Sequence, residues 1–298
     1  MTEQLVLRDS QVRLPDGRTL AYAEYGEADG YPVLFFHGTP GSRVQHPRMM
    51  MAGAAHSRII AVERPGYGRT DFHTGWGMLD WADDVAALAD ALELARFAVV
   101  GFSAGGPYAA ACAYRWPARV TALGLLGSVA PWPGDSAGAD RLPADDAGLD
   151  AWAVAARTLS WPEYRVWRTE VERSTPPDGE QIWLERVAEM SGPVFGLPEV
   201  REALQRSVRE TFRQGMEGIL YDGWLLRRPW GFRLEDIAVP AYVWQCEQDP
   251  TGRLSGAQYL ARTIPGCRAV YFPEEEHWIP PHYWKGILST LVGDRNAG

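Results

Sequence analysis

The chain has 298 residues, of which 46% are hydrophobic and 22% are charged. A chain of this length and composition can bury a large core, which excludes a disordered protein and a small stand-alone module. Its formal net charge of −9 argues against nucleic acid as a partner, because phosphate binding requires a basic surface.

The chain opens with two predicted antiparallel strands. Residues 11–14 and 19–25 flank the turn signal Pro15-Asp16-Gly17, and the second stretch alternates in the manner of a half-buried strand. Three later apolar runs do not alternate, which is typical of parallel strands buried on both faces. These runs are residues 32–36, 58–62 and 97–100, and further strands are predicted at 120–126, 241–244 and 268–272.

Residues at helical spacing lie between these strands. Trp81, Val85, Leu88 and Leu92 predict a helix over residues 78–94, with Asp80 as its cap. A run of small residues predicts a second helix over 104–114. Two more helices are expected near the end of the chain, at 255–263 and 283–292.

No strand is predicted between about Pro131 and Leu234. This segment contains turn-forming residues and four amphipathic stretches, at 150–159, 162–172, 180–190 and 199–221. The simplest account is one α/β core, residues 1–130 and 235–298, interrupted by a helical insertion at residues 131–234.

Ser103 lies in the segment Gly101-Phe102-Ser103-Ala104-Gly105-Gly106, between a predicted strand and a predicted helix. A chain that turns directly from strand to helix strains the turning residue, and glycines beside it avoid clashes. Such a turn presents Ser103 Oγ at the carboxyl edge of the sheet, where the helix dipole favours negative charge. We therefore predict Ser103 as a nucleophile, the alternative being a glycine-rich turn with an incidental serine.

A serine hydroxyl requires a general base to become a nucleophile. In a nucleophile elbow of this kind the acid and then the histidine follow the serine in the chain. His277 comes directly after the last predicted strand and is the expected base, whereas His282 is expected to be a surface or cap residue of the last helix. Asp249 follows the strand at 241–244 and would orient the imidazole, with Glu247 as the competing acid.

A tetrahedral oxyanion requires two preorganised N–H donors. The backbone N–H of Ala104 is one candidate. The backbone N–H of Thr39, in a Gly/Pro loop after the strand at 32–36, is the second. We interpret His37 in the same loop as a structural side chain that braces the loop, not as a second base.

Taken together, these motifs resemble the α/β-hydrolase fold superfamily, and more closely its lid-bearing branch of esterases, haloperoxidases and epoxide-hydrolase-like proteins. The resemblance implies a mostly parallel eight-stranded sheet with helices on both faces and a helical cap, or lid, at 131–234. Within this superfamily, epoxide hydrolases and dehalogenases use Asp at the elbow, so Ser103 argues against both. The resemblance rests on residues 14–18, 37–41, 63–70, Gly101–Gly106, 247–250 and His277.

The insertion holds seven of the 13 tryptophans, namely Trp132, Trp152, Trp161, Trp167, Trp183, Trp224 and Trp230. We expect most of them to pack the cap onto the core. The others would line a pocket for a large apolar or aromatic group, because aromatic rings bury much area at low entropic cost. The substrate-binding candidates are Phe102, Trp132, Trp224 and Trp278.

These residues predict a serine hydrolase, an esterase or lactonase, that cleaves a carboxylic ester or lactone of a sizeable apolar molecule. One alternative is a biosynthetic enzyme on the same fold that catalyses cyclisation, acyl transfer or carbon–carbon bond hydrolysis. Another is a ligand receptor, although a receptor has no physical need of Ser103, Asp249 and His277 together.

The remaining features concern location and partners. No apolar run approaches the roughly 18 residues of a membrane span, and no secretory signal is visible. Cys112, Cys246 and Cys267 lack metal-ligand spacing. We therefore expect a cytoplasmic protein, monomeric or homodimeric, with no metal, cofactor, nucleic-acid or membrane partner. A bacterial origin is expected from the basic residues, of which 28 are Arg and only one is Lys.

Overall fold

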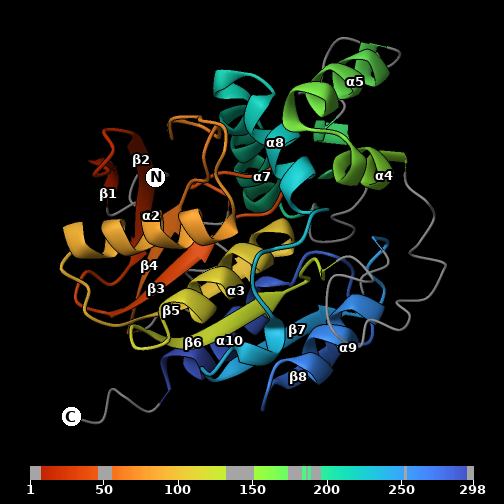
Figure 1. Ribbon diagram of the computed structural model, residues 1–298. Coiled ribbons are helices and arrows are strands. Elements are labelled where there is room, and N and C mark those ends of the chain that lie inside the picture. The colour runs from red at the N-terminus through yellow and green to blue at the C-terminus, as the bar shows by residue number, and fades with distance from the viewer. Residues whose placement is uncertain are drawn as a thin grey trace.

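The computed structural model describes residues 8–45, 56–131, 151–173, 183–185, 187–188, 196–251 and 254–293. Within these residues, an eight-stranded sheet is flanked by helices (Figure 1). The strands are β1 (Arg8–Arg13), β2 (Thr19–Gly26), β3 (Tyr31–Phe36), β4 (Ser57–Val62), β5 (Phe97–Phe102), β6 (Val120–Leu126), β7 (Ala241–Cys246) and β8 (Arg268–Phe272). The longer helices are α2 (Met78–Ala91), α3 (Gly106–Arg115), α4 (Ala151–Thr158), α5 (Trp161–Arg173), α7 (Pro198–Thr211), α8 (Glu217–Leu225), α9 (Leu254–Thr263) and α10 (Trp284–Val292).

The sheet has the strand order β1-β2-β4-β3-β5-β6-β7-β8. β1 and β2 form the predicted antiparallel hairpin, and β2 pairs antiparallel with β4. All other neighbours in the sheet are parallel. The predicted mostly parallel sheet is confirmed, and the carboxyl ends of β3 to β8 meet at one edge of it.

Alternate side chains of the central strands pack into two apolar layers, because successive residues of a strand point to opposite faces. In β3, Leu34 and Phe36 join the layer that includes α2, α3 and α9. Val33 and Phe35 join the layer that includes α10. Burial of both faces explains why these strands do not alternate in sequence.

In the described part of the chain, the longer helices between β6 and β7 are α4, α5, α7 and α8, here called the insertion helices. Shorter helical segments lie at residues 183–185 and 187–188 and in the 3₁₀ turns Phe212–Gln214 and Leu234–Asp236. Figure 1 shows the insertion helices gathered at one end of the sheet. Helix α8 meets loops that leave the carboxyl ends of strands, since Thr39 Oγ1 after β3 donates to Asp222 Oδ2 at 2.6 Å. The insertion helices therefore lie at the carboxyl edge of the sheet, while the division into a core and a lid at residues 131–234 stays a prediction.

Two expectations about helices are wrong in detail. The amphipathic stretch at 199–221 is not one helix. Helix α7 ends at Thr211, a 3₁₀ turn follows over Phe212–Gln214, and Gly215, with φ = 93°, ends that turn before α8 begins. Asp80 is not the cap of α2 but its third residue. Its carboxylate accepts the N–H of the cap residue Gly77 at 2.7 Å, the reciprocal half of a capping box.

No helix in the described part of the chain is both long enough and apolar enough to cross a membrane.

Candidate active site

Ser103 is a strained residue at the turn between β5 and α3. Its φ is 52°, in the left-handed region, which costs a non-glycine residue about 1–2 kcal/mol. The neighbouring glycines allow close backbone contact at this turn. A Cβ on Gly105 would lie 2.2 Å from Phe36 O, and one on Gly101 would lie 2.3 Å from Gly105 O. Backbone packing therefore holds the serine in the conformation that the sequence predicts.

The backbone after Ser103 turns into a helix at once. Residues Ser103–Gly105 form a single 3₁₀ turn that leads into α3. The first N–H groups of a helix have no carbonyl partner within it, and the helix dipole adds positive potential there. Ala104 N–H therefore lies where a developing negative charge is favoured.

Asp249 and His277 form a buried pair at the carboxyl edge of the sheet. Asp249 follows β7 and His277 follows β8, and the two residues are 7% and 4% exposed. His277 Nδ1 lies 2.7 Å from Asp249 Oδ2. Because a carboxylate accepts, Nδ1 carries the proton and Nε2 is left as the basic nitrogen of the neutral ring.

Further donors hold Asp249 in its charged form. Burial acts to raise its pKa, but the hydrogen bond and the electrostatic attraction of His277, together with hydrogen bonds from Thr251, outweigh burial and lower the pKa to about 2. Thr251 donates its N–H and its hydroxyl to Oδ1 at 2.8 and 2.6 Å. Glu247, the competing acid in the sequence, is exposed to solvent. The structure therefore places Asp249, and not Glu247, on the imidazole.

Two contacts bring His277 to the elbow. The rings of Phe102 and His277 have centroids 5.0 Å apart. The loop after β6 contacts both His277 and Ser103. A Cβ on Gly127 in this loop would lie 3.5 Å from His277 Cε1, and Val129 N–H donates to Ser103 O at 3.2 Å. Ser103 and the Asp249–His277 pair thus lie around the carboxyl ends of β5, β7 and β8, with the loop after β6 in contact with both.

The loop at residues 37–41, after β3, packs against the elbow. A Cβ on Gly38 would lie 3.3 Å from Ser103 Cβ. His37 braces the loop, since its Nδ1–H donates to Gly38 O at 2.8 Å and its Nε2 accepts Arg64 N–H at 3.2 Å. Burial and the nearby Arg64 hold the pKa of His37 well below its usual value. A neutral His37 ring with a hydrogen bond at each nitrogen fits the bracing role predicted for it.

The aromatic residues predicted to bind substrate do not lie together in the structure. Phe102 and Trp278 are buried next to His277, with their ring centroids 4.7 Å apart. Trp224 lies in α8, and its indole N–H donates to Leu159 O at 3.2 Å, which ties α8 to the segment between α4 and α5. Trp132 lies outside the described residues.

Trp224 belongs to an aromatic cluster of the insertion. Its ring centroid lies 5.4 Å from that of Tyr221 and 6.1 Å from that of Trp161. Tyr221 also stacks on Trp76 at 5.3 Å, a residue just before α2. This cluster joins the insertion helices to the core, which is the packing role expected for most of the tryptophans.

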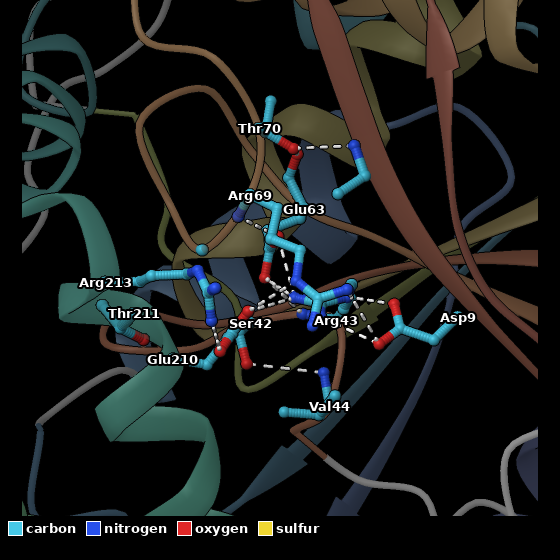
Figure 2. A network of polar contacts seen from close by, with 12 residues as sticks. Asp9, Ser42, Arg43, Val44, Glu63, Arg69, Thr70, Glu210, Thr211 and Arg213 are labelled. Carbon is cyan, nitrogen blue, oxygen red and sulfur yellow. Dashed lines mark hydrogen bonds and ion pairs between the residues drawn. The ribbon is translucent and has the colours of Figure 1, made fainter.

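A buried ion-pair network, which the sequence did not reveal, lies beside the 37–41 loop (Figure 2). Arg43 is 2% exposed and donates from Nη1 to Glu63 at 2.9 Å and to Glu210 at 2.6 Å. Its Nε donates to Asp9 Oδ1 at 2.7 Å. Asp9 lies in β1, Glu63 follows β4 and Glu210 lies in α7. The Arg43 guanidinium therefore links two parts of the sheet region to an insertion helix.

Asp222 in α8 is a second buried charge that the sequence did not single out. It pairs with Arg64, whose Nη2 lies 2.9 Å from Asp222 Oδ2. The two residues are 158 positions apart in the chain. No local pattern distinguishes Asp222 from the other acids of the insertion, so only the folded structure reveals its position.

The match to a family model decides the classification. Residues 31–281 match the model of the alpha/beta hydrolase fold. The chain belongs to the alpha/beta hydrolase fold family. This membership confirms the resemblance drawn from the motifs and agrees with the observed eight-stranded sheet.

The hydrolase-fold chain is similar to several named proteins. The non-heme chloroperoxidase of Streptomyces lividans is 39% identical over 123 residues, which are 40% of this chain and 45% of that protein. The chain spans less than half the length of the curated relatives it matches.

Solved structures match over nearly the whole chain. An esterase from Exiguobacterium antarcticum has a TM-score of 0.72 and 19% identity, over 96% of this chain and 100% of that one. An enol-lactonase from Burkholderia xenovorans LB400 has a TM-score of 0.57 and 20% identity, over 95% of this chain and 96% of that one. Likeness at such low identity establishes the fold.

Proposed function

We propose that the protein is a serine hydrolase that cleaves a carboxylic ester or a lactone of a sizeable apolar molecule. The observation that carries the proposal is the buried Asp249–His277 pair, bonded at 2.7 Å beside the strained Ser103. A positioned imidazole with a carboxylate behind it is the arrangement that activates a serine hydroxyl. The named esterase and lactonase of the same fold are consistent with this chemistry.

In the proposed acylation step, His277 Nε2 takes the proton of Ser103 Oγ as that oxygen attacks the carbonyl carbon. The carbonyl π electrons move to oxygen, and the N–H groups of Thr39 and Ala104 stabilise the oxyanion. Donors of this kind typically contribute about 3–4 kcal/mol each. Collapse of the intermediate breaks the carbon–oxygen bond, and the leaving oxygen takes the proton from His277.

Deacylation uses the same groups with water as the nucleophile. His277 removes a proton from water, the hydroxide adds to the acyl carbon, and Ser103 Oγ leaves with the proton returned by His277. Asp249 stabilises the imidazolium in both steps and stays ionised throughout. Its low pKa of about 2 supports that role.

The character of the substrate is proposed from the residues around the histidine. Phe102 and Trp278 are apolar and lie against His277. Aromatic side chains of this kind suit an apolar acyl or alcohol group. The buried charges nearby, Arg64 and Arg43, are already paired with carboxylates, so we propose a neutral substrate.

The test is hydrolysis of p-nitrophenyl esters of increasing acyl length by the wild type and by Ser103→Ala. We expect turnover by the wild type and a loss of about 10⁴-fold or more in the variant. A fluorophosphonate probe should add one phosphonyl group to the wild type and none to Ser103→Ala, as read by intact mass. A wild type that neither turns over esters nor reacts with the probe would remove the proposal and favour a receptor or a biosynthetic enzyme.

A further inference from the structure

Asp222 is a buried carboxylate that receives hydrogen bonds from four donors outside its own helix. Its side chain is 1% exposed. Oδ2 accepts from Thr39 Oγ1 at 2.6 Å, from Arg64 Nη2 at 2.9 Å and from Tyr67 OH at 2.8 Å, and Oδ1 accepts from Tyr108 OH. All four partners donate, so this position requires a group that only accepts, which an ionised carboxylate is.

Two of the four donors, Thr39 and Tyr108, come from the segments that carry the proposed oxyanion-binding groups. Thr39 supplies one of the two proposed N–H donors. Tyr108 lies in the first turn of α3, which begins at Gly106, two residues after Ala104. Arg64 and Tyr67 lie in the loop after β4. A single side chain of the insertion thus bonds to the parts of the core that hold both halves of the proposed oxyanion site.

The hydroxyl of Thr39 is fixed from two sides. It accepts a hydrogen bond from Arg64 Nη2 at 2.7 Å and donates its own proton to Asp222 at 2.6 Å. Arg64 in turn donates to His37 O and to Gly38 O, the latter at 3.2 Å. The guanidinium is therefore bonded to three successive residues of the 37–41 loop.

Asp222 supplies the negative charge that Arg64 requires in this site. Arg64 is fully buried, and an unpaired buried guanidinium is strongly unfavourable. The rings of Tyr67 and Tyr108 each lie 4.9 Å from its central carbon. Burial raises the pKa of both phenols well above the usual value, so both hydroxyls remain donors.

We propose that Asp222 is a positioning residue for the 37–41 loop, which it holds through Thr39 and Arg64 in the geometry that oxyanion binding requires. This inference rests on the proposed function. Stability alone does not account for the arrangement, because apolar residues of similar volume often stabilise a fold as well as a buried ion pair does. Asp222 belongs to the insertion, so docking of α8 completes a site whose reacting groups all lie in the core.

The first test uses Thr39, because its substitution leaves the Arg64–Asp222 pair in place. Thr39→Val keeps the shape of the side chain and removes the hydroxyl, whereas Thr39→Ser keeps the hydroxyl. Misplacement of a catalytic group by about 1 Å costs on the order of 10²-fold in rate, so kcat of Thr39→Val should fall about 10- to 100-fold. KM should change little, and Thr39→Ser should recover most of kcat.

The second test is a double-mutant cycle between Asp222→Asn and Thr39→Val. The asparagine keeps the volume and places an amide N–H₂ among the donors. If Asp222 acts through Thr39, each substitution lowers kcat, and the second has much less effect in the presence of the first. Glu210→Gln is the matched control, since Glu210 is also an insertion carboxylate on a buried core arginine, Arg43, and it should retain kcat.

Unfolding in urea is measured for every variant, so that loss of fold is separated from loss of kcat. If Asp222→Asn does not fold, the comparison of Thr39→Val with Thr39→Ser tests the positioning role. Unchanged kcat in Thr39→Val, or equal losses in Asp222→Asn and Glu210→Gln, overturns the positioning role and leaves the hydrolase proposal intact. A wild type without turnover and without fluorophosphonate labelling overturns both.

Discussion

Gly218 in α8 and Gly66 in the loop after β4 are in direct backbone contact. A Cβ on Gly218 would lie 2.6 Å from both C and O of Gly66, and one on Gly66 would lie 2.7 Å from Gly218 Cα. Gly66 also has φ = 82°, which favours glycine. Gly218 precedes Asp222 by about one helical turn. The absence of both side chains lets α8 approach closely enough for Asp222 to reach Arg64.

Replacement of Gly218 should therefore separate α8 from the core. In Gly218→Ala, the new methyl group meets backbone that cannot move freely, and we expect the free energy of unfolding to fall by about 1–3 kcal/mol. Activity should fall as well, because the Asp222 contacts lengthen. Urea unfolding and ester hydrolysis measure the two effects.

Gly223→Ala is the matched control in the same helix. A Cβ there would meet nothing closer than Tyr164 Oη at 3.7 Å, so this variant should gain up to about 1 kcal/mol from helix propensity. Equal stability changes at the two positions would contradict close contact of α8 with the loop.

The role of the acid is tested by Asp249→Asn against Glu247→Gln. The amide introduced by Asp249→Asn would no longer favour the tautomer with the proton on Nδ1 of His277, so kcat for ester hydrolysis should fall about 10⁴-fold. Glu247 is exposed, and its substitution should leave kcat unchanged. A large loss in Glu247→Gln with an active Asp249→Asn would reverse the assignment.

The Asp249 carboxyl should stay ionised in acid. Its pKa of about 2 lies below the ordinary value of 3.8, so the folded state binds its proton less readily than the unfolded state. The resulting stabilisation, about 2 kcal/mol, is fully present above pH 4 or so and is lost as the pH falls toward 2. Carbonyl ¹³C NMR of labelled aspartate should follow this titration.

A variant tests the cause of that low pKa. His277→Ala removes one of the donors and leaves the carboxyl buried, so the midpoint of the Asp249 titration should rise. A midpoint that stays near 2 in His277→Ala would assign the low pKa to the remaining donors, Thr251 and Gln245.

Loss of Arg43 should destabilise the fold more than loss of any exposed arginine. Arg43→Ala leaves Glu63, which is fully buried, without its guanidinium, at a cost of about 3–5 kcal/mol. Arg213→Ala is the control, because the Arg213 side chain is 53% exposed at its contact with Glu210, and it should cost less than about 1 kcal/mol.

The cost of Arg43→Ala should depend on pH. Burial raises the pKa of Glu63 to about 7, against the opposing effect of Arg43. Without Arg43 the pKa rises further. The wild type loses stability only until the pH passes the Glu63 pKa of about 7, whereas the variant continues to lose it at higher pH. Urea unfolding of both proteins between about pH 5 and about pH 9 should therefore show a difference that grows above about pH 7. A constant difference would mean that Glu63 does not titrate there.

Residues with local signals could be predicted from the sequence. Ser103 lies between a buried strand and glycines, and Asp249 and His277 each follow a strand, so chain order and strand ends were enough to place them. The parallel sheet followed from apolar runs that do not alternate, because burial on both faces requires consecutive apolar residues.

Other features depend on contacts between distant segments. Asp222 meets Thr39 across 183 positions, and nothing near it in the chain marks it as buried. The break at Gly215 was missed because the apolar spacing continues from α7 into α8. Trp224 was a candidate for the pocket, but its hydrogen bond to Leu159 follows from how the insertion helices pack, which periodicity does not reveal.

The left-handed backbone at Ser103 lowers the stability of the fold, although the proposed reaction requires a serine at this position. Glycine adopts this conformation without strain, so Ser103→Gly should make the protein about 1 kcal/mol more stable while it removes the proposed nucleophile. Variants of this chain selected only for thermal stability should therefore accumulate glycine at position 103. The selected proteins should be more stable and should lack the proposed hydrolase activity.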